Sequence, residues 1–98
     1  MIMVNRVKAS KMPTSVFIDD AETLGELIKA KRTGMGMKLA DCAALCGISI
    51  NTLSRIENGR VNSTLSAILS VLNGLGIKLT SKELSASKSN SSTDDEWI

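Results

Sequence analysis

The chain has 98 residues, the size of one domain with short tails, and a formal net charge of +2. Aromatic residues make up only 2% of it, so its core has to be built from aliphatic side chains and Met. No apolar run approaches the roughly 18 residues that a membrane-spanning helix needs, and the N-terminus lacks the apolar region of a secretory signal. We therefore expect a cytoplasmic protein without membrane contact.

The charge is unevenly distributed along the chain. Residues 1–82 contain eleven Lys or Arg and six Asp or Glu, a net charge of +5, whereas residues 83–98 have a net charge of −3. A basic body favours a polyanionic partner and an acidic tail does not.

The first element expected after an N-terminal arm is a helix. Residues 1–15 are polar, contain Pro13 and show no helical period, which predicts an arm outside the folded domain of residues 16–82. Val16-Phe17-Ile18 is a short β-prone run. Asp20 can then cap a helix whose apolar residues recur at helical spacing up to the glycines at positions 34 and 36.

Two short helices follow, separated by a glycine-containing turn. The second helix is predicted from about residue 38 to residue 46, where Gly47 ends it. Ser49 is a candidate N-cap for a third helix that runs to about residue 58, and Gly59 ends that helix.

The C-terminal part of the domain contains a fourth helix and a candidate strand. The helix begins near residues 63–64 and ends at the glycines at positions 74 and 76. Ile77-Lys78-Leu79-Thr80 then alternates apolar and polar residues as a half-buried strand does. The chain offers it no partner except residues 16–18, so pairing with a second copy is attractive. The predicted fold is all-α, with four to five helices and a short C-terminal β-strand that pairs across a dimer.

The two cysteines indicate neither a disulfide nor a metal site. Cys42 and Cys46 lie four residues apart on one helical face, too far apart for an unstrained disulfide. The chain has no His, so a metal site would lack ligands. We expect both to be small core residues and expect no metal or other cofactor. Without a phosphate-binding loop or a Ser or Cys beside a base, we do not expect an enzyme.

The two central helices and the turn Gly47-Ile48-Ser49 form a helix-turn-helix pattern, whose second helix can enter the DNA major groove. The residues that carry a family resemblance are Leu24-Gly25, Ile28, Arg32, Gly36, Ala43, Gly47-Ile48-Ser49 and Thr52-Leu53-Ser54-Arg55-Ile56-Glu57-Asn58-Gly59-Arg60. In these residues the chain resembles the Xre/Cro repressor family, and in Asn62-Ser63-Thr64-Leu65 and Val71-Leu72-Asn73-Gly74-Leu75-Gly76-Ile77 it resembles the HipB-type antitoxin branch. The resemblance covers about residues 20–80.

The resemblance implies a lambda-repressor-like domain that binds a palindromic operator as a homodimer. It also implies a repressor that regulates its own operon and neutralises a HipA-type kinase toxin, its second partner. Within the domain it implies a partly buried ion pair between Arg32 and Glu57 that joins the first and third helices.

The third helix has one face for the core and one for DNA. Leu53 and Ile56 lie three residues apart and point inward. The opposite face holds the candidate base contacts Ser49, Ile50, Asn51, Ser54 and Arg55. Asn can bind adenine, Arg can bind guanine, and an Ile can contact a thymine methyl group. The candidate phosphate contacts, which set register rather than sequence preference, are Lys38, Thr52, Asn58 and Arg60.

An alternative function is a protein-interaction adaptor with a degenerate helix-turn-helix that does not bind DNA. Leu39 stands where the family commonly has a Gln that contacts the DNA backbone, and Ile50 occupies a usually polar site. The arginines could also be solvated surface residues, and Ser49 could be only a cap.

The last segment, residues 83–98, is rich in Ser and acidic residues, which predicts a disordered tail. Trp97 is the only large aromatic residue in this tail and follows Asp94-Asp95-Glu96. Because Trp is enriched at binding hot spots, one interpretation is that Trp97 binds the partner protein, and the other is that it is incidental.

Overall fold

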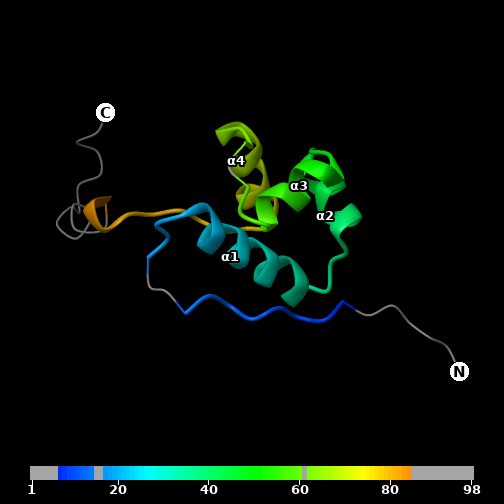
Figure 1. Ribbon diagram of the computed structural model, residues 1–98, viewed down its shortest axis with the longest axis horizontal. Coiled ribbons are helices and arrows are strands. Elements are labelled where there is room, and N and C mark those ends of the chain that lie inside the picture. The colour runs from blue at the N-terminus through cyan, green and yellow to red at the C-terminus, as the bar shows by residue number, and fades with distance from the viewer. Residues whose placement is uncertain (1–6, 15–16, 61, 85–98) are drawn as a thin grey trace, which may run out of the picture.

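The computed structural model describes residues 7–14, 17–60 and 62–84, and it is all-helical over these residues. The helices are α1 (Ala21–Gly34), α2 (Leu39–Cys46), α3 (Ile50–Glu57) and α4 (Leu65–Gly74). A further helical turn at residues 82–84 ends the described chain (Figure 1). The predicted all-α fold class is confirmed, and the four helices begin and end within about two residues of the predicted positions.

Side-chain caps explain where three of the helices begin. Asp20, Ser49 and Thr64 each accept a hydrogen bond from the backbone N–H three residues further along the chain. Each bond satisfies one of the N–H groups that a helix leaves unpaired at its first turn. The bond from Thr23 N also lowers the pKa of the Asp20 carboxyl.

All four helices contribute to one aliphatic core. Its buried members are Ile28, Cys42, Ala43, Leu53, Ile56, Val71, Leu72 and Leu75. The backbones of α1 and α3 approach closely at Gly25, because a Cβ atom there would lie 2.5 Å from the Ile56 carbonyl oxygen and 2.7 Å from that of Glu57. Only glycine fits at this crossing, so its position fixes how α3 lies against α1.

The described part of the arm lies along α1. Residues 7–14 have no regular secondary structure and run beside α1 in the opposite direction (Figure 1). The backbone N–H of Ser10 donates to Thr33 Oγ1 at 2.7 Å, near the C-terminal end of α1. The arm is therefore attached to the domain, although the predicted boundary placed it outside.

The segment predicted as a strand takes another conformation within the single chain. Residues 77–80 form no strand, and neither do residues 17–18, while Val16 lies outside the described residues. Ile77 N donates to the Leu72 carbonyl at 2.8 Å and so continues the end of α4. Ile77 packs against the core, whereas the Leu79 side chain is 55% exposed. A strand needs a hydrogen-bonding partner edge, and the described chain offers none here.

None of the described helices is long and apolar enough to cross a membrane.

Candidate nucleic-acid interface

The turn between α2 and α3 requires glycine because of its backbone conformation and not because a neighbouring group leaves no room for a side chain. Gly47 has φ +73°, in the left-handed region, and a Cβ atom there would meet nothing within 4 Å. The N–H of Ile48 then donates to the Ala43 carbonyl at 3.0 Å, which closes the end of α2. The chain thus turns between the two helices within three residues and begins α3 at the Ser49 cap.

The two faces of α3 differ sharply in burial. Leu53 is fully buried and Ile56 is 4% exposed. On the other side the predicted base contacts Ile50, Asn51 and Arg55 are exposed, as is Ser49 at the cap, and Ser54 is half-buried. The structure therefore places these five residues on or beside the solvent-facing side of one anchored helix.

The hydroxyl groups at the start of α3 bind each other. Ser49 Oγ accepts from Thr52 N at 3.0 Å and donates to Thr52 Oγ1 at 2.9 Å. The proton of Ser49 is therefore used within the protein, while the hydroxyl proton of Thr52 is left to donate outward. This arrangement suits the predicted phosphate contact of Thr52 and leaves Ser49 only its remaining acceptor capacity.

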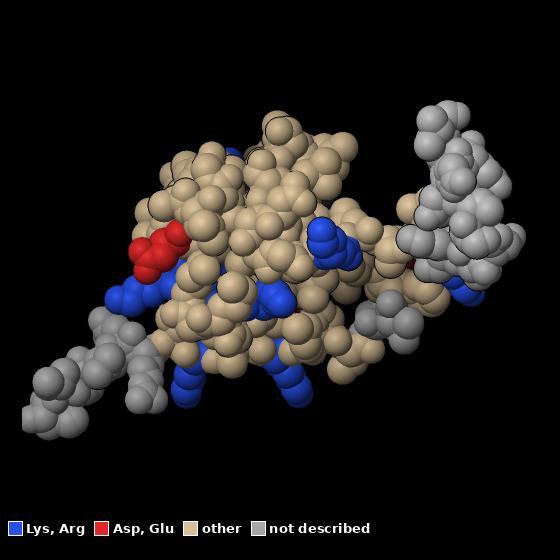
Figure 2. Space-filling model, turned by 180° about the vertical axis from the view of Figure 1, so that it is seen from behind, with Lys and Arg blue, Asp and Glu red and all other residues tan. Residues whose placement is uncertain are grey.

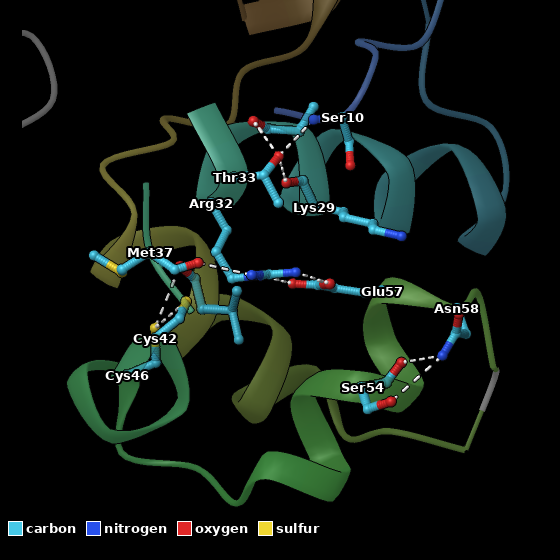
Figure 3. A network of polar contacts seen from close by, with 12 residues as sticks. Ser10, Lys29, Arg32, Thr33, Met37, Cys42, Cys46, Ser54, Glu57 and Asn58 are labelled. Carbon is cyan, nitrogen blue, oxygen red and sulfur yellow. Dashed lines mark hydrogen bonds and ion pairs between the residues drawn. The ribbon is translucent and has the colours of Figure 1, made fainter. Parts of the chain in front are cut away.

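The side chain of Asn58 is turned back onto α3. Its Nδ2 donates to the Ser54 carbonyl at 2.9 Å and approaches Ser54 Oγ at 3.4 Å (Figure 3). A phosphate contact through this amide, as predicted from the sequence, would compete with these bonds. Arg60 is exposed, and no ion pair engages it among the described residues, so its position suits such a contact.

The N-terminus of α2 is open. Lys38 is the N-cap residue, makes no side-chain cap, and is exposed. Leu39 packs against the core, so it cannot replace the polar side chain common in the family. The first N–H groups of α2 consequently have no side-chain acceptor from the cap and carry the positive end of the helix dipole, which suits a phosphate beside Lys38.

A buried ion pair joins α1 to the end of α3. Arg32 Nε donates to Glu57 Oε2 at 2.6 Å and its Nη2 to Oε1 at 2.9 Å, with the two side chains 9% and 5% exposed (Figure 3). The third donor, Nη1, binds the Met37 carbonyl at 2.7 Å, in the turn before α2. The hydrogen bonds to Glu57 raise the pKa of Arg32. One guanidinium thus holds α1, α3 and the start of α2 together.

Comparison with known proteins agrees with this geometry. A family model described as helix-turn-helix matches residues 28–81, more than half of the chain. The chain belongs to the helix-turn-helix family, of the Xre/Cro type. This domain is typical of DNA-binding transcription regulators. No curated protein was found to match the chain.

The two cysteines of the helix-turn-helix domain are free thiols. The Sγ atoms of Cys42 and Cys46 lie 4.0 Å apart, and burial raises the pKa of the Cys42 thiol to about 11. Such a thiol is a poor nucleophile at neutral pH. Among the described residues no group of His, Cys, Asp or Glu could hold a metal ion.

Sequence reasoning missed two features of the helix-turn-helix domain. The Met37 carbonyl as a third partner of Arg32 is a backbone contact, which no residue type signals. The contact of Thr33 with the arm was missed because Thr33 carries no helical periodicity signal. Trp97 and the other residues of the tail beyond Leu84 lie outside the described residues.

Proposed function

We propose that this protein is a sequence-specific transcriptional repressor that reads operator DNA with α3. The observation that carries the proposal is the division of α3 into a fully buried face and an exposed face with Asn51 and Arg55. The Ser49 cap and the Glu57 ion pair hold both ends of α3, so these two side chains project from a rigid element. A rigid support favours precise recognition because less freedom is lost on binding.

The test measures affinity for a duplex selected from a random pool and for unrelated DNA. Asn51→Ala and Arg55→Ala should each weaken binding to the selected duplex by about 1–3 kcal/mol and change binding to unrelated DNA much less. Asn73→Ala, which removes an exposed Asn from α4, is the matched control. Equal losses on both duplexes would reassign the residue to phosphate contact. A wild-type protein with no salt-dependent DNA binding would favour the adaptor.

The second copy in the proposed homodimer would cover an apolar groove. The groove has a volume of about 890 Å³ and lies between α1, α4 and residues 77–83. Its lining includes five well-exposed apolar residues, Leu65 at 70%, Phe17 at 56%, Leu79 at 55%, Ile18 at 45% and Leu69 at 40%. Within the described chain, no backbone hydrogen bond engages residues 78–80, so this edge is available for pairing. Such a dimer would place two recognition helices on a palindromic operator.

Sedimentation of surface variants tests this interface. Leu79→Asp should convert the dimer to a monomer, because a carboxylate would be buried without a partner. Leu45→Asp is the control, since Leu45 is exposed to the same degree, 56%, on α2 away from the groove. A Leu79→Asp protein that remains dimeric would place the interface elsewhere.

We also propose that the protein is an antitoxin that regulates its own operon and neutralises a HipA-type kinase toxin. The support is the resemblance of residues 62–77 to the HipB-type branch. In this proposal Trp97 inserts into a pocket of the toxin, and the acidic residues 94–96 steer the tail away from DNA. Trp97→Ala should weaken the complex with the toxin by about 2 kcal/mol or more and leave operator affinity unchanged. Unchanged affinity for the toxin would make Trp97 incidental.

A further inference from the structure

The N-terminal arm is attached to α1 by one well-defined bond. Ser10 N donates to the hydroxyl of Thr33, which is only 6% exposed. The same hydroxyl donates to the Lys29 carbonyl at 2.8 Å, so its orientation is fixed within the last turns of α1 (Figure 3). The arm is thereby held against the helix at Ser10 instead of leaving the domain there.

This attachment gives the arm a direction. The arm runs antiparallel to α1, and Ser10 is held near the C-terminal end of that helix (Figure 1). Two residues of chain span at most about 7 Å, so Lys8 lies close to that end. The turn of residues 35–38 follows α1 directly and leads to the open N-terminus of α2. The arm therefore leads toward the side of the domain where Lys38 stands.

All charged residues of the arm are basic, and those that the structure describes form no ion pair within the described chain. Residues 1–14 contain three Lys or Arg and no Asp or Glu. Lys8 and Lys11 are exposed, and neither forms an ion pair within the described chain. Figure 2 shows Lys and Arg side chains projecting from the lower edge of the molecule, where α1 and the arm lie. These charges extend the basic surface beyond the helix-turn-helix.

We infer that the arm is a second DNA-contacting element, which binds the phosphate backbone flanking the base pairs that α3 reads. The inference rests on the proposed DNA binding and adds to it. Lys8 neutralises a phosphate on the side where α2 begins, Lys11 neutralises one further back along α1, and Thr33 positions the arm for these contacts. Because the arm is already attached in the free protein, less conformational freedom is lost when it binds.

The test is the salt dependence of DNA binding by the full chain, on a selected duplex with and without flanking base pairs. The variant Lys8→Gln/Lys11→Gln removes two candidate phosphate contacts. The slope of log K against log [salt] should become shallower by about 1.8 for each bound chain, since each contact contributes about 0.9. For each bound chain, raising salt from about 50 to 200 mM should then weaken wild-type binding about 12-fold more than variant binding. The difference should disappear on the duplex without flanks.

Two further variants make the result specific. Lys29→Gln/Lys31→Gln removes the same charge from α1 itself, outside the arm and the proposed dimer groove, and should keep the wild-type slope. Thr33→Val removes the attachment of the arm without changing charge and should lower the flank-dependent affinity while recognition of the core sequence stays. If Lys8→Gln/Lys11→Gln keeps the wild-type slope, or if the control changes the slope equally, the inference about the arm is wrong. The proposed DNA binding by α3 would still stand. A wild-type protein without DNA binding overturns the proposed function as well.

Discussion

The ion pair between Arg32 and Glu57 gives the sharpest prediction for stability. Both side chains are nearly inaccessible to solvent, so removing either leaves a buried charge without its partner. Glu57→Ala should cost about 3–5 kcal/mol of unfolding free energy. Arg32→Ala should cost about 1 kcal/mol more, because it also removes the bond to the Met37 carbonyl. The double variant contains neither charge and should lose about 2–3 kcal/mol less than the sum of the two single losses.

Urea unfolding at about 15 °C, near the temperature of maximum stability, measures these differences. Glu26→Ala is the control: Glu26 is an exposed acid on α1 without an ion pair in the described chain, and it should change stability by no more than about 0.5 kcal/mol. Additive losses in the double variant would refute the reasoning, because they would show that the two residues do not interact.

Four further substitutions test the backbone and capping arguments by the same unfolding measurement. Gly25→Ala should destabilise the domain by about 1–3 kcal/mol, because its Cβ would collide with the backbone of α3, whereas Gly34→Ala, with nothing within 4 Å, should be neutral or stabilising by up to about 1 kcal/mol. Gly47→Ala should cost about 1–2 kcal/mol through its left-handed conformation alone. The lowered pKa of Asp20 means that its ionised form stabilises the fold above the ordinary value of 3.8, and this contribution is lost as the pH falls below it. Asp20→Asn, which keeps a capping oxygen, should lack that part of the acid sensitivity.

Most helix boundaries were predictable because a residue within one turn decides them, although α2 begins without a side-chain cap. Asp20 and Ser49 supply a cap acceptor, and Gly47 permits a backbone conformation that other residues resist. The inward face of α3 followed from helical spacing, with Leu53 and Ile56 buried, whereas on α4 the spacing of apolar residues did not identify the buried side, because Leu65 and Leu69 are exposed and Val71 is buried. The Xre/Cro resemblance also implied the pairing of Arg32 with Glu57, which the geometry contains.

The alternation of residues 77–80 predicted a strand that the single chain does not form, because a strand depends on a partner that its own residues do not specify. In the single chain Ile77 instead continues the end of α4 and packs on the core. The path of the arm depends likewise on a contact between residues 23 positions apart, Ser10 and Thr33. Polar residues without periodicity give no sign of such a contact in sequence.

The hydrogen bonds around α3 also rank the candidate DNA contacts in a way that residue types alone do not. Ser49 and Asn58 are both polar and exposed, but their donors are committed to Thr52 and Ser54. Asn51 and Arg55 have no such internal partners within the described chain, so binding a base edge costs them no protein hydrogen bond. We therefore expect Asn51→Ala and Arg55→Ala to reduce sequence discrimination more than Ser49→Ala does. Ser49→Ala should mainly destabilise α3, by about 1 kcal/mol for the lost cap, and thermal unfolding alongside DNA binding would separate the two effects. A Ser49→Ala protein with wild-type stability and lost discrimination would reverse this ranking.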